Sequence, residues 1–287
     1  MPLAKALCTN PITRIDGPAR REVRDDVLAV EEPLEIRVAG RSVAVVMRTP
    51  GHDRELAAGF LVTEGLVRER DDVLDMIYCG RGDATLSSHS EHGAGAASPN
   101  LPRENVLDVV LAPGVDVDFA RLSRNVFTSS SCGICSKATI EAVRREFAPL
   151  AAPVAPSRAV IAALPEKLRA AQAVFAATGA LHASALFTRE GELAVAREDV
   201  GRHNALDKVI GHAFFAGRLP LAGHLLCVSG RVSFEIMQKA LAGGIAVVAA
   251  ISAPTSAAVE LARESGQTLV GFVRGERMNV YAGTLAD

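Results

Sequence analysis

The chain has 287 residues, of which 49% are apolar, and it carries 31 basic against 33 acidic side chains. This profile indicates a folded protein with one large or two smaller domains, and it excludes a disordered tail or a fibre. A formal net charge of −2 argues against a general nucleic-acid or membrane-surface binder, because such proteins carry a strong basic excess. The longest apolar run, 245–253, is about half of the roughly 20 residues that span a bilayer. The N-terminus shows no hydrophobic signal core, so we expect a cytoplasmic protein that binds neither nucleic acid nor membranes.

The first third of the chain predicts a small α+β unit behind an irregular start. Residues 1–22 are polar and Arg-rich without periodicity, which predicts a mobile lead-in. Residues 34–47 alternate between apolar and polar side chains on both sides of a turn, which predicts a hairpin. Asp53 is the expected N-cap of a helix that Gly65 closes, and one further strand is expected over 106–111.

The remainder of the chain alternates between helical and strand patterns. The expected helices span 138–147, 167–178, 203–215, 233–241 and 255–264. The expected strands span 180–187, 192–197, 225–229, 245–251 and 268–273. Strands that alternate with helices of this length favour a mixed, largely parallel sheet covered on both faces, an α/β architecture. The order of elements suggests a cytidine-deaminase-like three-layer sheet, as a fold analogy only.

These patterns divide the chain into three parts. We expect a mobile N-terminal segment over 1–22, a small α+β domain over 23–126 and a larger α/β domain over 127–287. Residues 83–104 are rich in Ser, Gly, Ala and His and have no apolar face, which predicts an exposed loop. His89 and His92 in that loop could suggest a metal site, but so soft a segment does not preorganise ligands, and we expect both to be solvated.

Two of the five cysteines form Cys132-Gly-Ile-Cys135, in a Ser-rich loop that leads into an expected helix. A helix N-terminus and a Cys-x-x-Cys spacing both stabilise a thiolate, with pKa values of about 3.5 to 7.5 instead of about 8.5. The sequence around Cys8, Cys79 and Cys227 offers no comparable setting, and Cys227 is expected in the core. Cys132 is therefore the best candidate for a reactive thiolate.

Three kinds of chemistry compete for this pair. A structural zinc would need further ligands such as His182 and His203, and a thioredoxin-type dithiol would need a different strand context. The third is sulfur relay, in which a thiolate takes a sulfane sulfur from a donor persulfide. Deamination is rejected, because Ser184 stands where the catalytic Glu of the His-x-Glu motif would be and the Cys pair precedes the histidine.

A second set of polar residues follows the expected strands of the larger domain. The set consists of His182, Arg202, His203, Arg231, Phe272, Val273, Arg274, Gly275, Glu276 and Arg277. Ligands of open α/β sheets bind at the carboxyl ends of the strands, so these residues should converge on one crevice. Arginines beside glycines and helix N-termini suit a phosphorylated ligand, although a single arginine is more often solvated or salt-bridged. No Walker loop or Gly-x-Gly-x-x-Gly motif is present.

Long motifs in the chain resemble the formate dehydrogenase accessory sulfurtransferase family, FdhD. They are Arg48-Thr-Pro-Gly-His-Asp-Arg-Glu-Leu-Ala-Ala-Gly-Phe-Leu-Val-Thr-Glu-Gly, Ser130-Ser-Cys-Gly-Ile-Cys, Thr178-Gly-Ala-Leu-His-Ala, Glu198-Asp-Val-Gly-Arg-His-Asn-Ala-Leu-Asp-Lys, Ser229-Gly-Arg-Val-Ser-Phe-Glu and Gly271-Phe-Val-Arg-Gly-Glu-Arg-Met-Asn-Val-Tyr. The resemblance runs from about residue 20 to the end, with Ser136 where many members have Gly.

The resemblance implies a sulfurtransferase. Such a protein takes persulfide sulfur from a cysteine desulfurase and passes it to the molybdenum bis(molybdopterin guanine dinucleotide) cofactor of formate dehydrogenase. The persulfide carrier falls on Cys132, and the guanine-nucleotide contact region falls on 272–277. The resemblance also implies a cytoplasmic homodimer with no tightly held metal of its own, for which a free guanine nucleotide would mimic the client cofactor. Whether Cys135 is needed stays open, because a second thiol beside a persulfide can expel sulfide by forming a disulfide.

Overall fold

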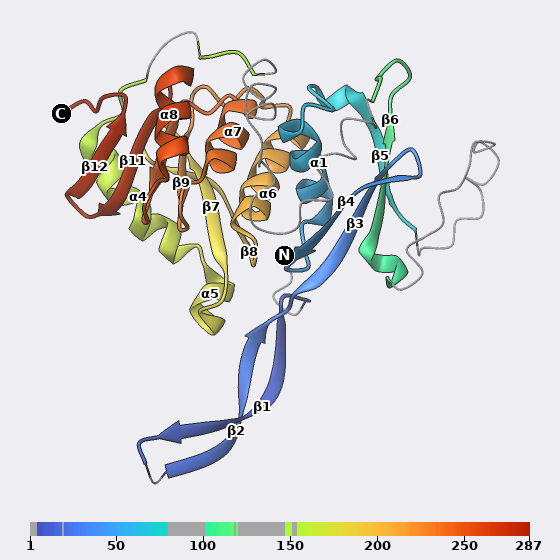
Figure 1. Cartoon of the computed structure of the whole chain (residues 1–287), viewed down its shortest axis with the longest axis vertical. Coiled ribbons are helices and arrows are strands. Elements are labelled where there is room, and N and C mark those ends of the chain that lie inside the picture. Colours follow the sequence, from blue (N-terminus) through green and yellow to red (C-terminus); the bar gives the residue numbers. More distant parts are fainter. Residues whose placement is uncertain (1–4, 19, 80–100, 118, 120–146, 151–153) are drawn as a thin grey trace.

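The structure, a computed structural model, describes residues 5–18, 20–79, 101–117, 119, 147–150 and 154–287 (Figure 1). These residues form a mixed α/β architecture with a six-stranded sheet, a four-stranded sheet and a two-stranded hairpin. Most of the predicted loop over 83–104 and most of the predicted helix over 138–147 lie outside the described residues. None of the helices in the described part is long and apolar enough to cross a bilayer.

The six-stranded sheet forms the centre of the larger part of the molecule. Its strands are β7 (His182–Phe187), β8 (Leu193–Asp199), β9 (Leu225–Val228), β10 (Val247–Ala250), β11 (Thr268–Arg274) and β12 (Arg277–Ala282), in the spatial order β12-β11-β10-β9-β7-β8. Strands β9, β10 and β11 are parallel, and β7 is antiparallel to both β8 and β9. β8 therefore runs in the same direction as β9, and the predicted mixed, largely parallel sheet is confirmed.

Helices cover both faces of this sheet (Figure 1). On one face, α4 (Arg158–Ala170) buries Ile161, Leu164 and Leu168 against a core that contains Cys227, as expected. Three helices on the other face build the main core: α6 (Arg202–Phe215), α7 (Phe234–Ala242) and α8 (Ser256–Ser265). The sequences of β9 and β10 are continuous apolar runs, because both faces of these strands are buried.

The four-stranded sheet packs against a helix of its own. It has the order β4-β3-β6-β5, with β3 (Glu32–Val38), β4 (Arg41–Arg48), β5 (Val73–Tyr78) and β6 (Val106–Leu111). Short 3-10 turns over Arg70–Asp72 and Arg103–Asn105 precede β5 and β6. The hairpin predicted over 34–47 is β3–β4, and the strand predicted over 106–111 is β6. Helix α1 (Asp53–Thr63) lies between this sheet and α6 (Figure 1).

Helices α1 and α6 approach each other at backbone distance. A Cβ added to Gly59 would lie 1.8 Å from the carbonyl oxygen of Asp207, and one added to Gly211 would lie 1.8 Å from that of Glu55. Only glycine leaves room for this contact. The two glycines thus fix how the smaller sheet unit sits on the larger one.

The N-terminal region differs from the prediction. Residues 1–22, expected as a lead-in without structure, contain β1 (Leu7–Asp16) and the start of β2 (Arg20–Ala29). The two strands pair antiparallel along their whole length and project from the body as an arm (Figure 1). Almost every side chain of β1 is exposed, so the sequence has no buried face by which its strand could be recognised.

Several boundaries also need correction. The helix predicted over 167–178 is two helices, α4 and α5 (Ala173–Thr178), and α4 begins nine residues earlier, at Arg158. Its Pro165 and the Pro-rich stretch before it concealed the helical pattern. Asp53 is the first residue of α1 rather than its N-cap, which is His52 in a left-handed conformation with φ 58°. The strands β5 and β12 were not predicted.

Candidate functional site

Polar side chains gather at the carboxyl edge of the six-stranded sheet. Because β8, β9, β10 and β11 run in the same direction, the segments that follow them meet there. β7 runs the opposite way and begins at this edge, where His182 pairs with Asp199 at the end of β8. The edge therefore carries the starts of α6 and α7 and the turn between β11 and β12.

His182, Arg202 and Gly230 lie against one another at this edge. A Cβ added to Gly230 would lie 3.2 Å from Nδ1 of His182 and 3.5 Å from Cδ of Arg202, so glycine permits the close approach. Burial, followed by the charges of Arg202 and Arg231, lowers the pKa of His182. Nε of Arg202 is buried and has no hydrogen-bond partner among the described residues. A buried donor without a partner is costly, and an anionic ligand would satisfy it.

His203, the second residue of α6, has both ring nitrogens engaged. Nε2 lies 3.2 Å from Oγ of Ser233 and Nδ1 lies 3.4 Å from Oε2 of Glu235. Burial, together with Arg202, Lys239 and His182, lowers the pKa of His203 to about 3. The ring is therefore neutral at pH 7 and adds no positive charge to the edge.

A buried ion pair holds the start of α6 in place. Nζ of Lys208 lies 2.6 Å from Oδ2 of Asp199, and both side chains are fully buried. The same carboxylate accepts hydrogen bonds from the backbone N–H of Thr49 at 3.2 Å and of Gly201 at 2.8 Å. Asp199 and Lys208 were part of a family motif without an assigned role. Their contacts give them one, because together they orient the segment that carries Arg202 and His203.

The end of β11 presents an aromatic ring and two arginines to solvent. Phe272 has φ 53°, a left-handed conformation that is strained for a residue with a side chain, and it is 40% exposed. The pairing of β11 and β12 is irregular between Gly271 and Arg274, and the bulge turns Phe272 out of the ladder. Arg274 and Arg277 flank the turn at Gly275 and are exposed.

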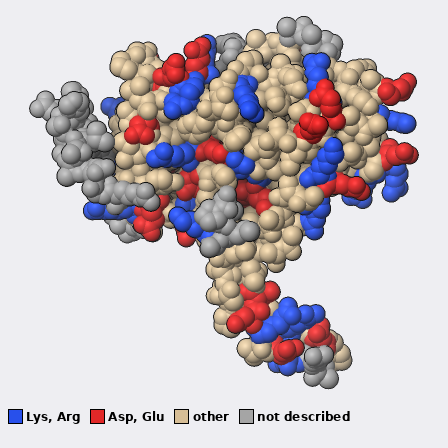
Figure 2. All heavy atoms as spheres, turned by 180° about the vertical axis from the view of Figure 1, so that it is seen from behind, with Lys and Arg blue, Asp and Glu red and all other residues tan. Residues whose placement is uncertain are grey.

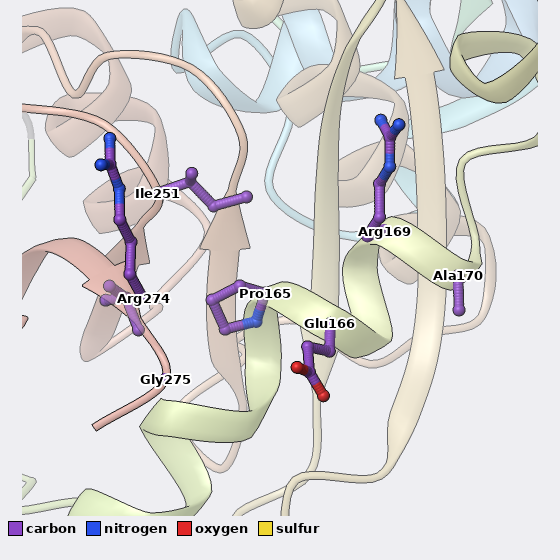
Figure 3. Close-up of a pocket in the computed structure, with 8 residues that line it drawn as sticks. Pro165, Glu166, Arg169, Ala170, Ile251, Arg274 and Gly275 are labelled. Carbon is purple, nitrogen blue, oxygen red and sulfur yellow. The ribbon is translucent and has the colours of Figure 1, made fainter. Parts of the chain in front are cut away.

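An open pocket of about 550 Å³ lies beside this turn, on the α4 face of the sheet (Figure 3). Arg274 from β11 and Arg169 from α4 stand on its two sides and point in the same direction (Figure 3). The guanidinium of Arg169 lies 4.2 Å from the ring centroid of Phe175. The residues that line the pocket are Pro165, Glu166, Arg169, Ala170, Ile251, Val273, Arg274 and Gly275. Arg169 was not among the predicted residues, because it lies within a helix and adjoins no expected strand.

The structure thus brings the predicted residues to one edge in two groups. His182, Arg202, His203 and Arg231 lie at the starts of β7, α6 and α7, whereas the segment 272–277 lies at the β11–β12 turn. The strand β10 lies between β9 and β11 and separates the two groups. Lysines, arginines and carboxylates are interspersed over the face seen in Figure 2, so any attraction for an anion is local.

The cysteines divide by their surroundings. Cys132 and Cys135 lie outside the described residues. Burial raises the pKa of Cys227 to about 12, and burial followed by the charge of Asp108 raises that of Cys79. Cys8 is exposed on β1. Within the described residues, no three side chains of the His, Cys, Asp and Glu types cluster closely enough to hold a metal ion.

Fold and site together define a mixed α/β protein with arginines, helix N-termini and an exposed aromatic ring at the carboxyl edge of its main sheet. The model of the FdhD/NarQ family matches residues 29–285. The chain belongs to the FdhD/NarQ family.

Individual relatives agree with this assignment. The chain is 53% identical over 263 residues to "Sulfur carrier protein FdhD" of Streptomyces avermitilis, which covers 91% of this chain and 88% of the relative. It is 53% identical over 269 residues to the protein of the same description from Mycobacterium tuberculosis, which covers 92% of each chain. A crystal structure assigned to a formate dehydrogenase accessory protein from Desulfotalea psychrophila has a TM-score of 0.71 and 25% identity, covering 97% of both chains.

Proposed function

We propose that this protein is a sulfur carrier that accepts sulfur as a persulfide on Cys132 and delivers it to the molybdenum cofactor of a formate dehydrogenase. The observation that carries the proposal is the family match over residues 29–285, which includes the Ser130-Ser-Cys-Gly-Ile-Cys motif. The relatives named as sulfur carriers are about half identical to this chain over nine-tenths of its length.

The sulfur-accepting step is a displacement at sulfur. The thiolate of Cys132 attacks the terminal sulfur of a persulfide on a cysteine desulfurase, forming a new S–S bond. The S–S bond to the desulfurase breaks, and its cysteine leaves as a thiolate. No external oxidant or reductant is needed.

The surroundings of two other cysteines support the choice of Cys132. Attack requires the thiolate, and the raised pKa values of Cys79 and Cys227 keep both groups protonated near neutral pH. Cys227 is also fully buried and cannot meet a second protein. The proposal leaves the role of Cys135 open.

The molybdenum cofactor that receives the sulfur is the substrate of this step. Its nucleotide phosphates are anions that the arginines at the sheet edge could bind. We propose that Arg202, Arg231, Arg274 and Arg277 contact phosphate and that Phe272 offers its ring to the guanine base. The unpartnered Nε of Arg202, the exposed ring of Phe272 and the pocket beside Arg274 support this assignment. The neutral His182 and His203 would shape the site without adding charge.

The following expectations stay predictions: a cytoplasmic homodimer and a cysteine desulfurase as donor, which the resemblance implies, and a domain boundary near residue 126, which the sequence pattern suggests. The sheet order β12-β11-β10-β9-β7-β8 supports a cytidine-deaminase-like plan, which we retain as a proposal. The alternative, in which the Cys pair holds zinc or acts as a redox dithiol, predicts metal or a reversible disulfide in the purified protein.

Complementation in cells tests the proposal. A bacterium that lacks its own sulfur carrier of this family should regain formate dehydrogenase activity with the wild-type chain. Cys132→Ala should abolish this rescue, whereas Cys8→Ala, at an exposed cysteine of the arm, should retain it. Full rescue by Cys132→Ala would contradict the proposal.

A further inference from the structure

Ser233, His203 and Glu235 lie together at the carboxyl edge of the six-stranded sheet. His203 lies in the first turn of α6, Ser233 is the N-cap of α7, and Glu235 lies in the first turn of α7. Nε2 of His203 lies 3.2 Å from Oγ of Ser233, and Nδ1 lies 3.4 Å from Oε2 of Glu235. A serine, a histidine and a carboxylate in this order are the arrangement that activates a serine hydroxyl for nucleophilic attack.

The contacts of His203 suit one tautomer. With Nδ1 protonated, the ring N–H lies beside the carboxylate of Glu235, and Nε2 is free to accept a hydrogen bond from the hydroxyl of Ser233. The buried surroundings keep the imidazole neutral, and its pKa of about 3 makes it a weak base. We therefore expect the hydroxyl of Ser233 to attack only acyl groups with a good leaving group. Burial raises the pKa of Glu235, and Lys239, whose Nζ lies 4.0 Å from its other oxygen, acts in the opposite direction.

The side chain of Ser233 does not cap helix α7. A serine at an N-cap usually accepts a hydrogen bond from a backbone N–H of the first turn, but the side chain of Ser233 forms no such bond. The neighbouring helix α8 shows the ordinary arrangement, in which Oγ1 of Thr255 accepts from the N–H of Ala258. The hydroxyl of Ser233 is therefore engaged by His203, and the N–H groups that begin the nine-residue helix α7 point to the same edge.

A second, independent feature indicates that a negatively charged ligand belongs here. Nε of Arg202, the residue before His203, is buried, and no residue in the described part of the chain forms a hydrogen bond with it. Arg231, two residues before Ser233, is exposed and close enough to influence the pKa of His182. An anionic group bound to these arginines would lie at the edge from which Ser233 is reached.

We propose that Ser233 is a nucleophile, with His203 as its general base and Glu235 as the group that orients His203, and that it acts on activated esters of acids carrying a second negative charge. Oγ of Ser233 forms a bond to the acyl carbon while its proton passes to Nε2 of His203. The bond from the acyl carbon to the leaving oxygen then breaks, and His203 returns the proton to the leaving group. Water repeats the sequence on the acyl-serine and releases the acid, so no oxidant or metal is required. This activity goes beyond sulfur transfer and does not depend on it.

The test uses the full-length protein and mono-p-nitrophenyl succinate, an ester whose free carboxylate the arginines would bind. The wild type should release p-nitrophenolate in a burst of up to one equivalent, and peptide mass spectrometry should find succinyl on Ser233. Ser233→Ala should abolish the burst. His203→Gln should slow acylation by about 10²- to 10⁴-fold, as expected for loss of a general base.

Two controls separate the proposal from incidental acylation. Ser256→Ala, at an exposed serine that begins the neighbouring helix α8, should acylate at the wild-type rate. p-Nitrophenyl acetate, which lacks the carboxylate, should react more slowly than the succinate. The absence of a burst in the folded wild type, or succinyl elsewhere in an undiminished Ser233→Ala reaction, would overturn the proposal.

Discussion

Arg202 carries a buried donor that no described residue satisfies. It begins α6, and the buried pair of Asp199 and Lys208 holds the start of this helix. Its Nε is buried without a partner, although most buried donors in proteins are paired. An orphan donor on a fixed element is expected where a ligand completes the hydrogen bonding.

Arg277 gives the sharpest prediction for nucleotide recognition. A charge-assisted hydrogen bond contributes about 1.5 to 3 kcal/mol, so Arg277→Ala should weaken binding of guanosine diphosphate about 10- to 100-fold. Arg277→Lys should recover little of the loss, because an ammonium lacks the planar two-donor fork. Calorimetry measures both. Arg189→Ala, at an exposed arginine on the opposite edge of the sheet, is the matched control and should bind like the wild type.

Two results would contradict this assignment. Binding of guanosine diphosphate by Arg277→Ala with wild-type affinity would exclude Arg277 from the site. No measurable binding by the wild type would remove the nucleotide site from this edge.

Residue patterns found part of this site and could not find the rest. His182, Arg202 and the segment 272–277 could be predicted because each adjoins an expected strand at the carboxyl edge. The contacts of His203 with Ser233 and Glu235 could not, because the residues lie about 30 positions apart and no spacing rule links them. The strain at Phe272 was equally invisible, since it arises from the irregular pairing of β11 with β12, a strand that was not predicted.

At the scale of elements, the close contact between α1 and α6 predicts that a glycine-to-alanine substitution destabilises the protein, contrary to its usual effect in a helix. Replacing glycine by alanine inside an exposed helix normally stabilises it by up to about 1 kcal/mol. In Gly59→Ala the new methyl would overlap the carbonyl of Asp207, so we expect a loss of about 1–3 kcal/mol or more in the free energy of unfolding. Urea titration measures it. At Gly223 nothing lies within 4 Å of an added Cβ, so Gly223→Ala should change little. Equal stability of Gly59→Ala and the wild type would show that the two helices do not pack this closely.

Several polar and charged side chains surround Glu55 of α1, close to the contact between α1 and α6. Its carboxylate lies 2.8 Å from Nη2 of Arg197 in β8 and 3.1 Å from Nδ1 of both His52 and His212. Burial alone would raise the pKa of Glu55, but the hydrogen bonds from Arg197 and His52 outweigh it and hold the pKa well below its ordinary value of 4.5. Glu55 therefore stabilises the fold above about pH 4.5, and this contribution is lost as the pH falls through the folded-state pKa.

Glu55→Gln should make this dependence visible. The variant should be less stable at pH 7 by about 1–3 kcal/mol, since it loses charge-assisted hydrogen bonds that solvent partly screens. Between pH 4.5 and pH 2 its free energy of unfolding should fall less steeply than that of the wild type. Urea titrations at several pH values test this, with the exposed Glu192→Gln as the control. Parallel curves for wild type and Glu55→Gln would refute the assigned role.

The strands that could be predicted have one or two buried faces, whereas most of the missed strands carry mainly exposed side chains. The hairpin β3–β4 and the strands β9 to β11 follow from apolar alternation or from continuous apolar runs. β1 and β2 carry mostly exposed side chains, and β12 is an exposed edge strand, so their sequences show neither pattern. The boundary of α4 was misplaced because its proline suggested a break that the helix tolerates.

At the scale of the whole molecule, the candidate ligand edge belongs to a sheet that is covered by helices on both faces. The six-stranded sheet is clamped between α4 on one face and α6 to α8 on the other, and α1 joins it to the smaller sheet (Figure 1). The arm formed by β1 and β2 stands apart from these layers. In the function proposed above, this edge would hold the nucleotide part of the client cofactor, and Cys132 would carry the sulfur.

The central claim is that Cys132 carries the transferable sulfur. Intact-protein and peptide mass spectrometry after incubation with a cysteine desulfurase and cysteine tests it most directly. We predict that the wild type gains the mass of one sulfur atom on the peptide that contains Cys132, that dithiothreitol removes it, and that Cys132→Ala gains none. An undiminished sulfur adduct on Cys132→Ala, or one located on Cys8 or Cys79 of the wild type, would contradict the account.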